Sequence, residues 1–181
     1  LVYTGIIDSI RNPMPLLKAM REEFSKEKGD VKFTFVGRVS DQVRGEIAAD
    51  SWLSTHVHFA GYVSHQEVFG FYEKADALAL ILTSTKNAKG NIPGKLFEYM
   101  ATTLPILALG DPEGDSAKIL KEAEAGQVFS PSDHVAIQVS LRRLFERSGK
   151  AESARGIDQY SRRNLSVQLA KLLDADSVSR S

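Results

Sequence analysis

The stretch from Gly90 to Leu109, GNIPGKLFEYMATTLPILAL, combines residues suited to binding a phosphate and a sugar. Its pattern predicts a loop, a helix that begins at Pro93 and then a buried strand, because proline is favoured at the first helical position. Lys95 falls in the first turn, where the helix dipole disfavours a cation unless a phosphate binds there. Glu98, one turn later, could accept hydrogen bonds from two vicinal hydroxyls. We therefore interpret this stretch as a phosphate-and-sugar site.

Short apolar runs alternate with longer helical patterns along the chain. This alternation predicts an α/β fold, a doubly wound, Rossmann-like parallel sheet of about six strands with helices on both faces. The run Ala77–Leu82 is apolar without alternation, as expected for a strand buried on both sides. The expected strands are Leu1–Thr4, Lys32–Val36, Val57–Ala60, Ala77–Leu82, Pro105–Leu109 and Gln127–Ser130. The expected helices are Pro13–Lys28, Gln42–Leu53, Gln66–Lys74, Pro93–Thr103, Ser116–Ala125, Asp133–Arg147 and a last one from Ala151 to Ala175.

Local signals support this division of the chain. Ser64 and Glu67 have the spacing of a capping box at the start of the third helix. No internal repeat or low-complexity linker interrupts the pattern. We therefore expect residues 1–175 to form one domain and residues 176–181 to form a loose tail.

The expected topology places a ligand where two loops meet. In a doubly wound sheet, ligands bind at the carboxyl ends of the strands, where the strand order reverses. With the order 3-2-1-4-5-6, the reversal lies between the first and fourth strands, which brings together the loops Gly5–Asn12 and Thr83–Ile92. Gly5 would let the backbone approach a ligand closely, and the planar guanidinium of Arg11 suits a phosphate. The helix after the second loop adds its N-terminus.

Composition excludes several classes of function. The 181 residues are 43% hydrophobic and carry no net charge, so no electrostatic footprint for nucleic acid or an anionic membrane is expected. The absence of cysteine excludes disulfides and fits a cytoplasmic protein. No run approaches the length of a membrane span. The chain begins inside an expected strand without an initiator Met, which we interpret as a piece of a longer protein, one whose missing part could associate with a membrane.

No metal or resident cofactor is expected. His56 and His58 alternate on a short strand, but no third ligand lies nearby in the sequence.

Four segments together resemble the C-terminal, donor-binding domain of family 4 retaining glycosyltransferases, the group 1 type with the GT-B fold. They are LVYTGIIDSIRNPMPLLKAM, VKFTFVGR, VHFAGYVSHQEVFGFYEKADALALI and IPGKLFEYMATTLPILAL. The resemblance covers nearly the whole chain. It implies that an N-terminal acceptor-binding domain is missing, and that the last helix would cross back to pack on it.

The resemblance also assigns roles to individual residues, with two departures. The glycine-led loop of the family usually carries an Arg after the Gly, where this chain has Ile6, and a second cation further on, which corresponds to Arg11. The two-glutamate motif keeps its second member as Glu98, a ribose ligand, whereas its first member falls on Gly90. Contacts to the donor sugar must then come from backbone or from Asn91. The nucleotide-sugar-binding residues expected are Gly5, Arg11, Tyr62, Val63, Gly90, Asn91, Ile92, Pro93, Gly94, Lys95 and Glu98, with Arg11 and Lys95 also catalytic.

Three functions remain open at this stage. The first is the donor-binding half of a glycosyltransferase, which would move a sugar from a nucleoside diphosphate sugar to a hydroxyl with retention and would be inactive alone. The second is a nucleotide-sugar epimerase domain of the same fold, and the third is a non-catalytic nucleotide-binding module. Simpler structural interpretations also stand: Arg11 as a solvated residue, and Lys95 in a surface pair with Glu98. The sequence does not identify the base, the sugar or the acceptor.

Overall fold

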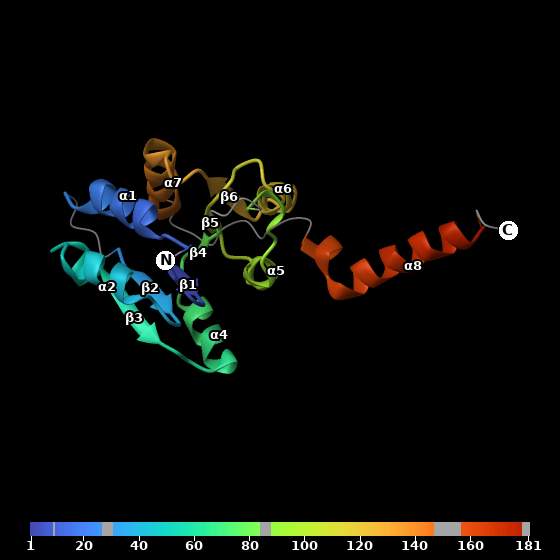
Figure 1. Ribbon diagram of the computed structural model, residues 1–181, viewed down its shortest axis with the longest axis horizontal. Helices are drawn as coiled ribbons and strands as arrows, with labels where there is room; N and C mark the ends of the chain where they lie inside the picture. The colour runs from blue at the N-terminus through green and yellow to red at the C-terminus, as the bar shows by residue number, and fades with distance from the viewer. Residues whose placement is uncertain (9, 27–30, 84–87, 147–156, 179–181) are drawn as a thin grey trace.

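A computed structural model describes residues 1–8, 10–26, 31–83, 88–146 and 157–178, with the side chains of the last range described to residue 171. This part of the chain folds around a parallel sheet of six strands in the order β3-β2-β1-β4-β5-β6 (Figure 1). The expected fold class and strand order are confirmed. The strands are β1 Val2–Thr4, β2 Phe33–Val36, β3 Val57–Gly61, β4 Leu78–Ile81, β5 Ile106–Leu109 and β6 Gly126–Phe129.

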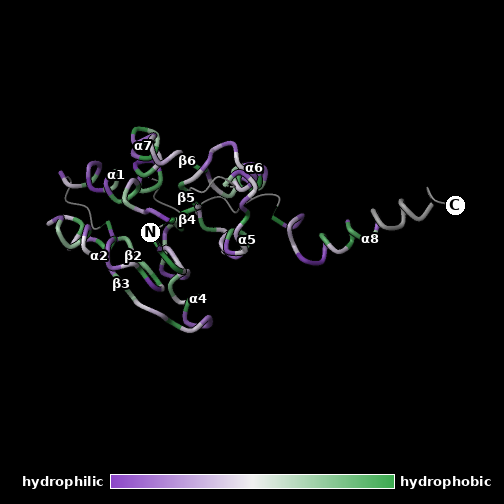
Figure 2. The backbone as a smooth tube through the Cα atoms, viewed as in Figure 1, coloured by the Kyte–Doolittle hydropathy of each residue, from purple (hydrophilic) through white to green (hydrophobic). Residues whose placement is uncertain are grey.

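Helices cover both faces of this sheet. The α-helices are α1 Met14–Phe24, α2 Asp41–Ala48, α3 Leu53–His56, α4 His65–Glu73, α5 Gly94–Ala101, α6 Asp115–Glu122, α7 His134–Glu146 and α8 Arg162–Val178. Two short 3-10 helices are η1 Ala88–Gly90 and η2 Ile157–Tyr160. Helices α1, α2, α3 and α7 pack on one face, and α4, α5 and α6 pack on the other. Hydrophobic and hydrophilic residues alternate along α1 and α7, as expected for helices with one face on a core (Figure 2).

Strand β4 shows why the sheet sequences are apolar without alternation. Ala79 and Ile81 belong to the core on the α1 side, whereas Leu78 and Leu80 belong to the core on the α5 side. All four residues of the strand are buried. Because side chains alternate between faces, a strand covered on both sides needs an apolar residue at every position.

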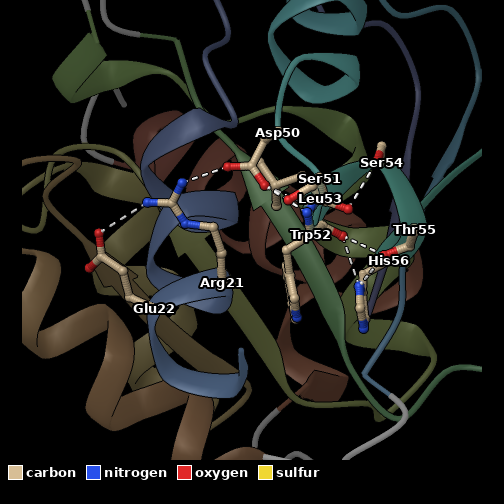
Figure 3. Close-up of polar contacts among 9 residues, drawn as sticks. All are labelled: Arg21, Glu22, Asp50, Ser51, Trp52, Leu53, Ser54, Thr55 and His56. Atoms are coloured by element: carbon tan, nitrogen blue, oxygen red, sulfur yellow. Dashed lines mark hydrogen bonds and ion pairs between the residues drawn. The ribbon is translucent and has the colours of Figure 1, made fainter. Parts of the chain in front are cut away.

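The expected helix Gln42–Leu53 is in fact two helices, α2 and α3, separated by a turn at Asp50. The Oδ1 atom of Asp50 accepts hydrogen bonds from the N–H groups of Trp52 and Leu53, both at 3.0 Å. Its Oδ2 atom accepts from Arg21 of α1 at 2.5 Å, so one carboxylate starts α3 and ties it to α1 (Figure 3). An Asp side chain that competes for backbone N–H groups favours a turn over a helix interior.

Most helix boundaries differ from expectation by one or a few residues, and two of these differences concern the start of α5 and the last helix. Pro93 precedes α5 as its N-cap residue, with an extended backbone of φ −71° and ψ 139°, so it is not the first helical residue. The last helix, α8, begins at Arg162 and continues past Ala175 to Val178, and the expected start at Ala151 lies outside the described residues. The capping box at Ser64 is confirmed, because both reciprocal hydrogen bonds with Glu67 are present.

Helix α8 extends away from the rest of the fold (Figure 1), and its residues 162–171 are all exposed. None of the described helices is long and apolar enough to cross a bilayer.

Candidate functional site

A crevice of about 450 Å³ opens at the carboxyl ends of β1 and β4, where the strand order reverses. The two loops that the sequence predicted to meet both contribute to it. The lining residues are Gly5, Ile6, Asp8, Arg11, Leu80, Ile81, Leu82, Thr83, Asn91, Pro93, Gly94 and Lys95. Six of the expected site residues therefore share one crevice, namely Gly5, Arg11, Asn91, Pro93, Gly94 and Lys95.

The backbone conformation at Gly5 favours a glycine, and the residue also lies against the side chain of Lys95. Its φ of +115° lies in a region that side-chain-bearing residues rarely adopt. A Cβ at this position would also collide with the ammonium group of Lys95. The glycine thus allows the side chain of Lys95 to pass directly over the loop after β1.

Lys95 reaches into the crevice, where its partners among the described residues are neutral groups. Its Nζ donates a hydrogen bond to the main-chain carbonyl of Thr4 and lies 4.4 Å from the ring centroid of Tyr3. Among the described residues it forms no ion pair, so the surface pair with Glu98 that the helical spacing allowed is not present. Burial, with a smaller repulsion from Arg11, lowers the pKa of Lys95 to about 8, and attraction from Glu98 opposes the shift.

Arg11, in contrast, has a carboxylate partner. Its guanidinium donates to Oδ2 of Asp8 at 2.6 Å, and both side chains are about one-third exposed, at 32% and 39%. The other carboxylate oxygen of Asp8 accepts from the N–H of Ile10 at 3.2 Å. The sequence analysis did not single out Asp8, although its position three residues before Arg11 indicates a possible ion pair. The charge of Arg11 is therefore balanced within the loop, unlike that of Lys95.

Buried hydroxyl groups support the floor of the crevice. The hydroxyl of Tyr99 accepts from the N–H of Thr4 at 2.8 Å and lies 3.1 Å from its Oγ1 atom. The hydroxyl of Tyr72 lies 3.2 Å from the same Oγ1. Burial raises the pKa of Tyr99, so it stays a neutral phenol. These contacts fix the end of β1 and with it the carbonyl that receives Lys95.

Asn91 is held by two residues that sequence reasoning did not single out. Its Nδ2 donates to Oγ1 of Thr83 at 2.8 Å, and its carbonyl accepts from Oγ of Ser116 at 2.7 Å. Both Thr83 and Ser116 are buried. Ser116 lies on α6, so this helix fixes the loop that leads into α5. No local pattern revealed the link, because Ser116 is 25 residues from Asn91.

The other expected residues lie outside this crevice. Glu98 is exposed and lines a larger hollow of about 1670 Å³ together with Phe69 and Tyr72. Water can therefore hydrate the carboxylate of Glu98 in the absence of a ligand. Tyr62, at the end of β3, is 84% exposed, and Val63 is half-buried. Gly90 and Ile92 are exposed in the loop before α5.

The described residues contain no group of three His, Asp or Glu side chains that could hold a metal ion. His56 stacks on Trp52 with ring centroids 3.9 Å apart (Figure 3), and neighbouring His58 is exposed on β3.

Comparison with protein families gives one match, to the family described as glycosyl transferases group 1, over residues 1–147. A search of curated proteins gives no match.

Solved structures of glycosyltransferases resemble the fold. Anabaena Alr3699/HepE in complex with UDP has a TM-score of 0.71 at 13% identity, with 96% of this chain and 48% of that one covered. WaaG, a glycosyltransferase involved in lipopolysaccharide biosynthesis, has a TM-score of 0.63 at 16% identity, covering 81% and 38%. The C-terminal domain of a group 1 family protein, LpcC from Francisella tularensis, gives 0.61 at 15%, covering 81% and 75%. This chain thus spans less than half the length of HepE and WaaG.

Proposed function

Since this chain belongs to the glycosyl transferases group 1 family, we propose that it is the donor-binding half of a retaining glycosyltransferase. The enzyme moves a sugar from a nucleoside diphosphate sugar to a hydroxyl acceptor. The 38% and 48% coverage of WaaG and HepE supports a missing acceptor-binding domain, and α8, exposed over residues 162–171, would contact it. The structure of HepE with UDP supports a nucleoside diphosphate as the ligand class.

The observation that carries this proposal is the charge of Lys95. Its ammonium is partly buried in the crevice against a carbonyl and an aromatic ring, and neither group neutralises it. An uncompensated cation in a partly desolvated site favours binding of an anion. The N-terminus of α5, which has no side-chain cap, adds the positive end of the helix dipole beside the ammonium of Lys95.

Arg11 supplies the second cation of the site. Ile6 stands where the family usually has an arginine, and the ammonium of Lys95, from another part of the chain, lies beside Gly5. For Arg11 to bind a phosphate, its ion pair with Asp8 must open or be shared. The diphosphate and Asp8 then compete for one guanidinium.

The other expected residues contact the ribose, the base and the donor sugar. Glu98 accepts from the ribose hydroxyls, and backbone near Tyr62 and Val63 contacts the base. Asn91, fixed by Thr83 and Ser116, contacts the donor sugar together with the backbone of Gly90, Ile92 and Gly94.

Chemistry at this site consists of stabilising the leaving group. As the bond from the sugar to the diphosphate breaks, negative charge grows on the phosphate oxygens. Cations and helix N–H groups that are already in position stabilise that charge without reorganising. Lys95, Arg11 and the start of α5 fill this role. No nucleophile from this half of the protein is needed if the acceptor attacks on the face that the diphosphate leaves.

Calorimetry on the 181-residue chain tests the proposal. UDP, GDP and ADP are titrated separately, each beside its nucleoside. We expect one diphosphate to bind with a Kd in the high-micromolar range, about −5 to −6 kcal/mol, because only half of the cleft is present. Its nucleoside should bind much more weakly, and no sugar should be transferred. Absence of heat from all three diphosphates at millimolar concentration would overturn the nucleotide site.

A non-catalytic module is the second candidate, because Ile6 and Gly90 replace two charged residues of the family pattern. Such a module would bind the diphosphate equally well. The longer protein is assayed with sugar derivatives of the bound nucleotide. A glycosylated acceptor would identify a transferase, an epimerised sugar an epimerase, and neither product the non-catalytic module.

A further inference from the structure

Tyr3 lies directly beneath the crevice and contacts both of its anion-binding elements. The side chain is 1% exposed at the centre of β1. The face of its ring meets the ammonium of Lys95, 4.4 Å from the centroid. Its hydroxyl donates to the carbonyl of Ile6 at 3.0 Å, in the residue that follows Gly5. One buried side chain thus connects the glycine-led loop to the cation of α5.

The kind of contact matters for the charge of Lys95. A carboxylate at the position of the ring would hold the ammonium but cancel its charge. An aromatic face attracts a cation through its quadrupole and leaves the net charge unchanged. The carbonyl of Thr4, the second partner, is neutral as well. The ammonium is therefore held at one position while its charge remains available to a ligand.

The hydroxyl of Tyr3 has a separate effect on the loop. A buried tyrosine hydroxyl needs a hydrogen-bond partner, and here the partner is the carbonyl of Ile6. This bond fixes the backbone immediately after Gly5, whose φ of +115° already departs from ordinary geometry. Burial raises the pKa of Tyr3 to about 12, so the hydroxyl keeps its proton throughout the physiological range.

We propose that Tyr3 is a positioning residue for the diphosphate site, which holds the Lys95 ammonium with its ring and the glycine-led loop with its hydroxyl. The inference rests on the proposed function, because it names what orients the cation of that site. Tyr3 does not touch the ligand. Its effect on binding passes through Lys95 and through Ile6.

If Tyr3 served only to pack the core, its substitution would affect the site no more than substitution of another buried ring. Tyr3 also packs edge-on against Phe35, with ring centroids 5.9 Å apart in the same core cluster. Phe35 is equally buried, but the ring that Lys95 contacts is that of Tyr3, which makes Phe35→Leu the matched control for Tyr3→Leu. Tyr3→Phe keeps the ring and removes only the hydroxyl.

The experiment follows two quantities in the 181-residue chain and its variants. The first is the titration midpoint of Lys95 without ligand, from the ¹³Cε shift of labelled lysine, assigned with Lys95→Arg. The second is the Kd for inorganic pyrophosphate, a probe that needs neither base nor ribose. The groups that act on this titration are the ring of Tyr3, Arg11 of the first loop and Glu98 of α5, and the variants leave both charged groups unchanged.

Tyr3→Leu should lower the titration midpoint of Lys95. It should also raise the Kd for pyrophosphate about threefold to thirtyfold, the range of a partly desolvated cation–π contact. Tyr3→Phe should keep the midpoint and weaken pyrophosphate less. Phe35→Leu should reduce the melting temperature and keep both site properties. Equal midpoints and equal Kd values in Tyr3→Leu and Phe35→Leu would overturn the inference. Wild-type protein that binds no pyrophosphate would overturn the proposed function instead, together with the anion role assigned here.

Discussion

The side chain of Lys95 crosses from α5 to donate a hydrogen bond to the carbonyl of Thr4, 91 residues earlier in the chain. This contact brings the cation of α5, which follows β4 in the chain, onto the glycine-led loop that follows β1. It also leaves the cation without a carboxylate among the described residues, at some cost to folding.

Lys95→Met should raise stability while removing phosphate binding. The pKa of Lys95 is lowered to about 8 in the folded protein, so below pH 8 the unfolded chain holds the charge more favourably. The melting temperature of Lys95→Met should therefore exceed that of wild type at pH 7. The difference should shrink as the pH rises from about 8 toward 10.5, where lysine in the unfolded chain also loses its proton. Thermal melts across this pH range measure it.

The same variant should weaken binding of the nucleoside diphosphate by about 1.5–3 kcal/mol, as expected for the loss of a charged hydrogen bond. Lys74→Met, an exposed residue after α4, is the control and should change neither property. A Lys95→Met protein that melts lower than wild type at pH 7 would show that the ammonium stabilises the fold, contrary to this account.

Arg11 and Asp8 should have opposite effects on binding. Arg11→Ala removes a phosphate ligand and should weaken the nucleoside diphosphate by about 1.5–3 kcal/mol, with little change for the nucleoside. Asp8→Asn removes the carboxylate that competes for the same guanidinium, so it should strengthen diphosphate binding. Calorimetry on both variants measures their affinities for the nucleoside diphosphate and for the nucleoside. An equal loss for nucleoside and diphosphate in Arg11→Ala would exclude contact with phosphate.

Glu98→Gln tests the ribose contact. A carboxylate accepts from both vicinal hydroxyls, whereas an amide offers one acceptor oxygen and a misdirected donor. The substitution should cost about 1.5–3 kcal/mol of affinity for the ribonucleotide and almost nothing for the 2′,3′-dideoxy nucleotide. Comparing both proteins with both ligands isolates the coupling. If Glu98→Gln leaves the ratio of the two affinities unchanged, Glu98 does not hold the ribose.

Asp50→Ala should destabilise the fold without affecting the crevice. The variant loses two backbone hydrogen bonds at the start of α3 and the ion pair with Arg21, a loss of about 1–3 kcal/mol. Hydrogen bonding, led by the N–H of Leu53, lowers the pKa of Asp50, so its contribution is present above the ordinary value of 3.8 and lost as the pH falls through the folded pKa. Urea unfolding at pH 7 and pH 3 measures this, with Asp41→Ala as an exposed control that should lose less.

The sequence predicted the sheet well because its signals are local. The apolar run Ala77–Leu82 and the capping box at Ser64 depend on neighbouring residues only, and the strand order is a common one for doubly wound sheets. The break at Asp50 was missed because a carboxylate that caps the next helix resembles an ordinary polar helix residue. Its Arg21 partner is 29 residues away.

Within the site, the sequence indicated where residues would gather but not how they would pair. The loops of Gly5 and Asn91 meet as expected, since parallel strands end at one edge of the sheet. The contacts of Lys95 with Tyr3 and of Ser116 with Asn91 depend on tertiary packing, and no spacing reports them.

We propose that Lys95 binds the diphosphate of a nucleotide at the reversal between β1 and β4. A crystal structure of this chain with the tightest-binding of UDP, GDP and ADP would show this contact. We expect a phosphate oxygen about 2.7–2.9 Å from Nζ of Lys95, the distance of a charged hydrogen bond, with the ribose against Glu98. A nucleotide bound elsewhere, or a diphosphate in the crevice with Lys95 still held on the carbonyl of Thr4 and out of its reach, would contradict the claim.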